Sequence, residues 1–313
     1  MDELFGRLAL PVICAPMFLV SEPILTIAAC KAGVVGSFNC RNARTPEEFE
    51  SWIERIDCEL AAARQADPQA PIAPYAVNLP VRRPTHTRFD ADLEICVRHK
   101  VPLIISMNGN PREIVEAAHA YGGKVIHDVT SVEFARKAAD AGVDGLIALC
   151  AGAGGHTGYL SPFALLPQIR RFFPGLVVLA GAITDGRSIR AAQVLGADLA
   201  YMGTRFIATQ EAQVAPEYKA LLLSQQTRDV MTTDRISGLA ANFMRGSITA
   251  RRLDPENLPP PTGVFQAALP DGIKAWRDVW SAGHGVGLID DIPSVAELVA
   301  RLRREYDEAA PSP

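Results

Sequence analysis

Short apolar runs alternate with longer amphipathic segments along the first two thirds of the chain. Each run is nearly unbroken in apolar residues, which is typical of strands that are covered on both faces. The predicted strands are residues 11–17, 34–38, 72–79, 102–106, 124–127, 145–149, 176–180 and 199–202. The predicted helices between them are residues 22–31, 46–66, 90–99, 111–121, 131–141, 162–172 and 188–195.

Residue types at the ends of the amphipathic segments support these boundaries. Thr45 and Pro46 supply an N-cap and a first-turn proline. Gly142 and Gly196 each follow a predicted helix, where a left-handed terminal residue favours glycine. Eight strand–helix units that close on themselves predict an α/β fold of the (β/α)8 TIM-barrel class. An open doubly wound sheet is the second choice, because it usually has fewer strands.

The pattern changes after Thr204. Residues 215–224 and 239–244 look helical, whereas residues 232–237 are ambiguous and residues 255–272, rich in Pro and Gly, predict a loop. Residues 294–306 form a well-capped predicted helix. We therefore expect a barrel of residues 1–210 plus 283–313, with residues 211–282 forming a helical and loop region that caps the substrate site.

The composition narrows the classes of partner and compartment. The 313 residues fit one barrel with an appendage, and 48% hydrophobic content argues against disorder. The net charge of −4 gives no basic surplus, so neither nucleic acid nor a membrane surface is expected as a partner. The six cysteines are scattered without zinc spacing, which predicts a reduced cytoplasmic location and no metal site.

A targeting signal and a membrane anchor are also not expected. Asp2 and Glu3 stand where a signal peptide needs positive charge, and Pro11, Pro16 and Glu22 interrupt the first apolar stretch. No window of the sequence reaches the ~20 apolar residues of a membrane span.

Small residues follow the last two predicted barrel strands. Gly181 comes after the seventh strand, and Gly203 and Thr204 come after the eighth. Such turns let backbone N–H groups point at a phosphate, which TIM barrels commonly bind at this position. The sequence therefore predicts a cofactor or substrate that carries a phosphate.

The loop after the sixth strand surrounds one histidine with glycine. Gly152, Gly154, Gly155 and Gly158 flank His156. Glycine permits close approach to a flat ligand, and a histidine at a strand end can take a proton from carbon. We expect His156 to be catalytic. His127 and His284 are the next candidates, whereas the remaining three are expected at the solvated surface: His86, His99 and His119.

Residues 153–158, AGGHTG, resemble the AGGHxG signature of the nitronate monooxygenases, formerly called 2-nitropropane dioxygenases. Further similar segments lie at residues 15–17, 77–79, 124–126, 129–135, 181–183, 202–206 and 281–289. The resemblance covers most of the chain, and it implies a TIM barrel that binds FMN without a covalent bond.

The resemblance also implies roles for single residues. The isoalloxazine ring would be lined by Ala15, Pro16, Met17, Asn78 and Lys124, with Gly154 and Gly155 close to it. Gly181, Gly203 and Thr204 would hold the phosphate, and His156 would match the catalytic histidine. The positive charge of Lys124 would stabilise an anionic reduced ring.

The implied reaction is oxidation of an alkyl nitronate or nitroalkane by dioxygen, giving a carbonyl compound and nitrite. Two alternatives stay open at this stage: reduction of quinones or enoyl thioesters by NAD(P)H, as in related barrels, and flavin binding without turnover. Gly152 stands where many family members carry an acid, and their tyrosine-bearing motifs are not evident here. A homo-oligomer is also left open.

Overall fold

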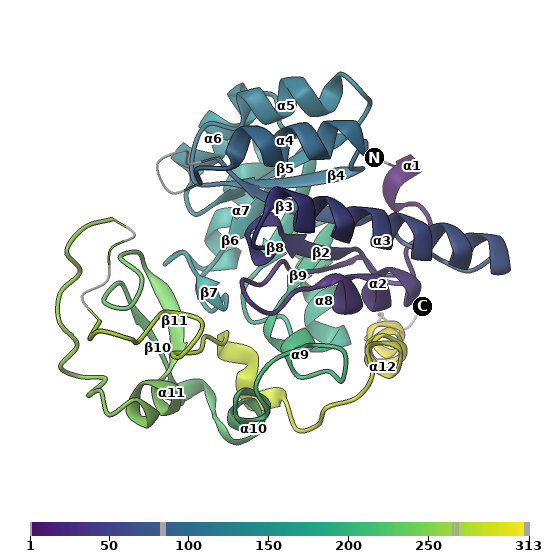
Figure 1. Ribbon diagram of the computed structural model, residues 1–313. Helices are drawn as coiled ribbons and strands as arrows, with labels where there is room; N and C mark the ends of the chain where they lie inside the picture. The colour runs from purple at the N-terminus through teal and green to yellow at the C-terminus, as the bar shows by residue number, and fades with distance from the viewer. Residues whose placement is uncertain (1, 82–85, 265, 267–268, 310–313) are drawn as a thin grey trace.

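The computed structural model describes residues 2–81, 86–264, 266 and 269–309 (Figure 1). Eight parallel strands pair in the order β1-β9-β8-β6-β5-β4-β3-β2. A parallel bridge between Ile13 and Val35 joins the first strand to the last and closes the barrel. The strands are β1 (Val12–Cys14), β2 (Gly36–Asn39), β3 (Tyr75–Pro80), β4 (Leu103–Met107), β5 (Lys124–Val129), β6 (Gly145–Leu149), β8 (Leu176–Ala180) and β9 (Leu199–Met202). The predicted TIM barrel is confirmed.

Helices surround the barrel, and most match the predicted amphipathic segments. They are α2 (Pro23–Lys31), α3 (Pro46–Ala66), α4 (Phe89–Arg98), α5 (Arg112–His119), α6 (Val132–Asp140), α7 (Pro162–Arg170), α8 (Gly186–Val194) and α12 (Val295–Glu308). The Thr45 hydroxyl caps α3 by accepting the Glu48 N–H at 3.2 Å, and Ser294 and Glu297 form a capping box on α12. Among the described residues, no helix has the length and apolar content needed to cross a bilayer.

Three short helical segments and the N-terminal helix complete the barrel part: α1 (Asp2–Phe5), η1 (Cys40–Asn42), α9 (Thr204–Ile207) and η3 (His284–Leu288). The tail returns to the barrel, where α12 packs beside α8 and α2 (Figure 1). The buried guanidinium of Arg205 fixes this return by donating to Asp291 Oδ1 at 2.9 Å.

Side chains of each strand alternate between two apolar layers. Ile105 and Ile126 point into the barrel, whereas Val125 and Val129 pack toward the helices. Because the strand period is two, Asp128 shares the inward face of β5 with Ile126, and His127 shares the outward face with Val125. This alternation decides which polar residues can reach the open end of the barrel.

The described residues of the region 211–282 lie to one side of the barrel and contain more strand than expected (Figure 1). Their elements are α10 (Pro216–Ser224), η2 (Thr227–Asp229), β10 (Val230–Thr233), β11 (Ala241–Met244) and α11 (Arg245–Ala250). The prediction of a helix over residues 239–244 is wrong, since β11 pairs with both β10 and β7 (Gly155–His156). Four residues contain too few apolar positions to separate a period of 2 from one of 3.6.

Gly36→Ala tests the packing of α2 on the barrel. A methyl group at this buried strand position would overlap the Thr26 carbonyl of α2, so the backbone must shift. We expect a loss of about 2–3 kcal/mol in the free energy of unfolding, in the range of overpacked cores. Gly122→Ala is the control, because its methyl group would enter open space and the positive φ alone costs about 1–2 kcal/mol. Equal losses in denaturant melts would contradict this account.

Candidate active site

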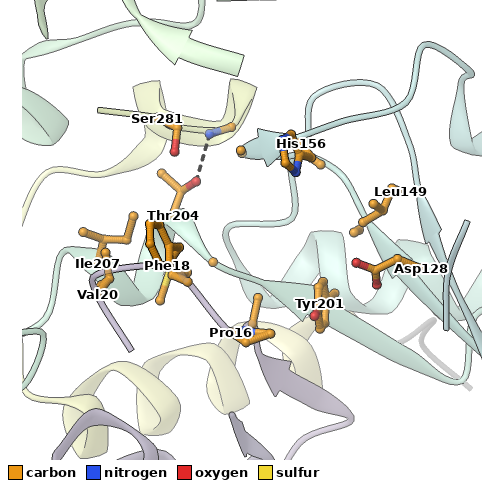
Figure 2. Close-up of a pocket in the computed structure, with 18 of the residues that line it drawn as sticks. Pro16, Phe18, Val20, Asp128, Leu149, His156, Tyr201, Thr204, Ile207 and Ser281 are labelled. Atoms are coloured by element: carbon orange, nitrogen blue, oxygen red, sulfur yellow. Dashed lines mark hydrogen bonds between the residues drawn. The ribbon is translucent and has the colours of Figure 1, made fainter. Parts of the chain in front are cut away.

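The carboxyl ends of the barrel strands open into a cavity of about 440 Å³ (Figure 2). This volume lies within the range of cofactor and ligand sites, and the position is the usual one for TIM-barrel chemistry. Ten residues predicted from the sequence line it together: Ala15, Pro16, Met17, Asn78, Gly154, Gly155, His156, Gly181, Gly203 and Thr204.

Lys124 does not belong to this group, so its predicted place beside the flavin needs correction. It is the first residue of β5, at the opposite end of the barrel, where its Nζ lies 3.0 Å from Asp144 Oδ1. Asp128 lies four positions further along the extended strand, a rise of roughly 13 Å. Asp128, not Lys124, lines the cavity.

Three chain segments meet at one side of the cavity with almost no space between them. A Cβ on Gly154 would lie 2.9 Å from both the Gly283 nitrogen and Thr204 Oγ1. The Gly283 N–H donates to Thr204 Oγ1 at 2.9 Å, the bond dashed in Figure 2. Because the Thr204 hydroxyl accepts this bond, its own proton stays available for an anion. Gly181, with φ +147°, also lines the cavity.

Two asparagines fix each other in the cavity wall. Asn39 Nδ2 donates to Asn78 Oδ1 at 2.5 Å, and Asn78 Nδ2 donates to the Ile105 carbonyl at 2.9 Å. Both side chains are buried, so the chain of bonds sets the orientation of each amide. Asn39 was not predicted, because it follows the apolar run of residues 34–38 as a single polar residue without a motif.

His156 lies on β7, which pairs with β11 of the region 211–282. Its ring meets the Trp276 ring edge to face, with centroids 5.2 Å apart. Burial lowers the pKa of His156 to about 4, so the imidazole is neutral at pH 7 and can accept a proton. Trp276 also contacts Phe18 and Phe243 and forms an aromatic wall that the sequence did not reveal.

The other two candidate histidines lie outside the cavity lining. His127 points outward, where its Nδ1 lies 2.8 Å from Ser106 Oγ. His284 belongs to η3, and its flanking residues Gly283 and Gly285 line the cavity in its place. His99 and His119 are partly exposed, with 19% and 41% of their side chains accessible, and each lies 2.8 Å from an acid, Glu50 and Asp144 respectively.

Asp128 is an acidic group in the cavity wall to which the sequence assigned no role. Its Oδ1 is buried and has no hydrogen-bond partner among the described residues. Burial raises the pKa of Asp128 to about 7. The pKa of the neighbouring Tyr201 is raised far above its usual value, first by burial and then by the charge of Asp128. Figure 2 shows the two side chains close to Leu149.

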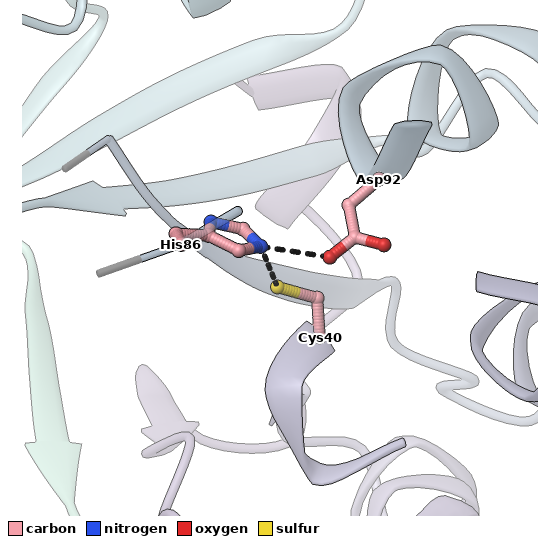
Figure 3. Close-up of side chains that lie close together, drawn as sticks. All are labelled: Cys40, His86 and Asp92. Carbon is pink, nitrogen blue, oxygen red and sulfur yellow. Dashed lines mark hydrogen bonds and ion pairs between the residues drawn. The ribbon is translucent and has the colours of Figure 1, made fainter. Parts of the chain in front are cut away.

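A second polar cluster, drawn in Figure 3, joins Cys40, His86 and Asp92. His86 is buried, so the expectation that it is solvated is wrong. Its Nδ1 lies 2.8 Å from the Pro80 carbonyl, and its Nε2 lies 2.8 Å from Asp92 Oδ2. A carbonyl only accepts, so Nδ1 donates to Pro80, and Nε2 faces both Asp92 Oδ2 and Cys40 Sγ, the latter at 3.8 Å.

The same cluster is close enough to hold a metal ion, but its hydrogen bonds oppose one. Both ring nitrogens of His86 are engaged, and Arg88 Nη2 donates to Asp92 Oδ2 at 3.2 Å. A guanidinium at this oxygen disfavours a cation there. Arg88 Nη2 also donates to the Cys40 carbonyl at 2.9 Å, so the network anchors the segment next to Asn39.

The chain is similar over most of its length to proteins of known family. The nitronate monooxygenase family matches residues 4–305. A nitronate monooxygenase of Paraburkholderia phytofirmans is 30% identical over 96% of this chain and 93% of its own.

The chain belongs to the nitronate monooxygenase family. It is therefore an oxidoreductase. FabK from Thermotoga maritima superimposes with a TM-score of 0.78 at 27% identity, covering 98% of this chain and 95% of the other. A nitroalkane oxidase from Streptomyces ansochromogenes superimposes with a TM-score of 0.79 at 24% identity over 98% of both chains, which shows the shared fold.

The buried titratable groups of this family member predict how its stability depends on pH. His127 and His156 have pKa values of about 4 in the folded protein, against 6.5 for a free histidine. The unfolded chain therefore binds more protons between these values, and both histidines make stability rise with pH. Asp128, with its pKa raised from 3.8 to about 7, acts in the opposite direction.

Asp128→Asn should therefore steepen the rise of stability between pH 4 and 6.5. For one proton the slope increases by at most about 1.4 kcal/mol per pH unit. Thermal or urea unfolding of flavin-free protein at several pH values measures it. An unchanged slope would show that Asp128 titrates alike in the folded and unfolded chain.

Proposed function

We propose that this protein is an FMN-dependent nitronate monooxygenase, which oxidises alkyl nitronates with dioxygen to a carbonyl compound and nitrite. The observation that carries this proposal is the placement of His156. A neutral, partly buried imidazole lines the same cavity as a glycine junction at which only small residues fit. The family match over residues 4–305 supports the same reaction class.

The cavity residues fit FMN. The Gly283 N–H is engaged by Thr204 Oγ1, so the Thr204 hydroxyl and the backbone N–H groups at Gly154, Gly181 and Gly203 would be the donors to a phosphate. Ala15, Pro16, Met17 and Asn78 would face the ring. When bound, FMN would accept electrons from the substrate and deliver them to dioxygen.

His156 handles the proton in this proposal. Its neutral imidazole takes the α-proton of a nitroalkane, and for a nitronate it holds the substrate oxygens through its own N–H. Trp276 and Phe18 exclude water from this side of the cavity, which strengthens both interactions. The neutral state at pH 7 follows from the pKa of about 4.

Anaerobic mixing tests the function. Nitronate should bleach the absorbance of the bound flavin, and admission of dioxygen should restore it with release of nitrite. In separate experiments the protein is mixed anaerobically with NADH and with NADPH, and the rates of bleaching are compared with that given by nitronate. Rapid bleaching by a nicotinamide but not by nitronate would replace this proposal with reduction of quinones or enoyl thioesters. A flavin that no donor reduces would indicate a binding protein without turnover.

Thr204→Val tests the phosphate site. The change removes one hydrogen bond to a charged group, worth about 1.5–3 kcal/mol, so FMN affinity should fall roughly tenfold or more. The affinity for riboflavin, which lacks the phosphate, should fall much less. Thr249→Val on the exposed face of α11 is the matched control. Equal affinity of wild type and variant in a fluorescence titration would place the phosphate elsewhere.

His156→Ala should retain FMN and lose ~10²–10⁴-fold in turnover of a neutral nitroalkane, the usual cost of removing a general base. The corresponding nitronate is already deprotonated, so its turnover by the variant should fall less. His119→Ala, at a partly exposed position on α5, is the control. Equal loss with both substrates would show that His156 orients substrate without taking a proton, and full activity would refute the assignment.

A further inference from the structure

Asp128 occupies a different part of the cavity from the glycine junction. In Figure 2 it lies with Tyr201 and Leu149, well away from Thr204 and Ser281. The glycine junction suits a phosphate, so the ring of a bound flavin would extend toward the other side of the cavity. Asp128 is the acidic residue that lines this cavity in the part of the chain that the structure describes.

Arg41 is the basic residue that lines the cavity, and its guanidinium lies over the Phe18 ring, 5.9 Å from the ring centroid. Burial alone accounts for the raised pKa of Asp128, so we find no basic group among the described residues that compensates its charge. The strands beside β5 end in Met107 and Leu149, which carry no charge. Tyr201 faces it from β9 as a neutral phenol, since its pKa is raised far above the usual value. Lys124, on the same strand, is paired with Asp144 at the opposite end of the barrel. His156, also in the cavity lining, is neutral at pH 7.

An isolated carboxylate is costly in such surroundings, whereas a carboxylic acid needs only one acceptor for its proton. Oδ1 is buried and has no partner among the described residues, so a bound ligand is the natural source of one. The oxidised isoalloxazine ring offers several acceptor atoms along its polar edge but a single N–H. A neutral acid also tolerates the negative charge of a reduced ring, which a carboxylate would repel.

We propose that Asp128 binds the flavin as a neutral carboxylic acid, donating its proton in a hydrogen bond to an acceptor on the ring. The inference rests on the FMN assignment made above. It gives Asp128 the role of a cofactor-binding residue whose protonation state controls flavin affinity. The raised pKa of about 7 in the flavin-free protein agrees with it, because the acid persists to neutral pH.

The proposal fixes the sign of a linked equilibrium. A flavin that prefers the protonated acid raises the pKa of Asp128 further, and its binding takes up a proton near neutral pH. Affinity is then constant at low pH and falls as the pH rises above the pKa, by at most roughly tenfold per pH unit for one proton. If Asp128 instead accepted the ring N–H as a carboxylate, flavin affinity would rise with pH.

Riboflavin binding to flavin-free protein from about pH 6 to pH 8.5 tests this, since riboflavin has no phosphate that titrates in this range. Fluorescence quenching gives the affinity. Wild-type affinity should fall across the upper part of the range. Asp128→Asn keeps the shape and an uncharged N–H donor, so its affinity should stay flat and near the low-pH wild-type value. Asp140→Asn, exposed on α6, is the matched control and should follow wild type.

Two results would overturn the proposal: wild-type affinity that rises with pH, or a fall of the same size in Asp128→Asn. Asp128→Leu separates donation from shape, and its affinity should be flat and several-fold below that of Asp128→Asn. Absence of flavin binding by wild type at every pH would refute the cofactor assignment, and thus the proposed function. If flavin binds but its affinity does not depend on the protonation of Asp128, only the proposal for Asp128 fails and the proposed function stands.

Discussion

The junction between Gly154, Gly283 and Thr204 is the constraint on which the site depends. It joins the loop after β6, the end of β9 and the C-terminal segment, which are far apart in the sequence. A side chain at Gly283 would reach the Gly152 carbonyl at 2.6 Å, so these segments meet only where side chains are absent. The ion pair of buried Arg205 with Asp291 holds the returning tail in this register. Removal of one partner would leave an uncompensated charge, which is why such pairs resist change.

Burial sets the chemical state of the site more than any specific neighbour does. The same desolvation keeps His156 neutral by lowering its pKa and lets Asp128 hold its proton up to about pH 7 by raising its pKa. These two side chains therefore add little charge to the cavity wall near neutral pH, where Arg41 is the fixed charge among the described lining residues. Entry of water would weaken the desolvation on which both pKa shifts depend.

The barrel could be predicted from the sequence because strands covered on both faces are continuous apolar runs. The glycine turns and His156 could be placed as well, since barrel ligands bind at the carboxyl ends of strands. Lys124 shows the limit of this reasoning. A run of residues identifies a strand, but the end of the strand that a residue occupies decides whether it reaches the cavity. Asp128 lies on the same strand, faces inward and stands at the carboxyl end, so it reaches the cavity. No sequence motif marks it.

Contacts between distant segments could not be predicted. β7 is two residues long and exists because β11 pairs with it, and Asn242 Nδ2 reinforces the pairing by donating to the Ala153 carbonyl at 2.7 Å. His156 is thus held by the barrel loop and by the region 211–282 at once, and Trp276 of that region contacts its ring. The residues of the proposed phosphate site belong to the barrel and its returning tail. The surroundings of the proposed base therefore vary with residues 211–282, while the proposed phosphate site does not. If His156 is the base, its substrate would be decided more by residues 211–282 than by the barrel, since a fold by itself does not fix function.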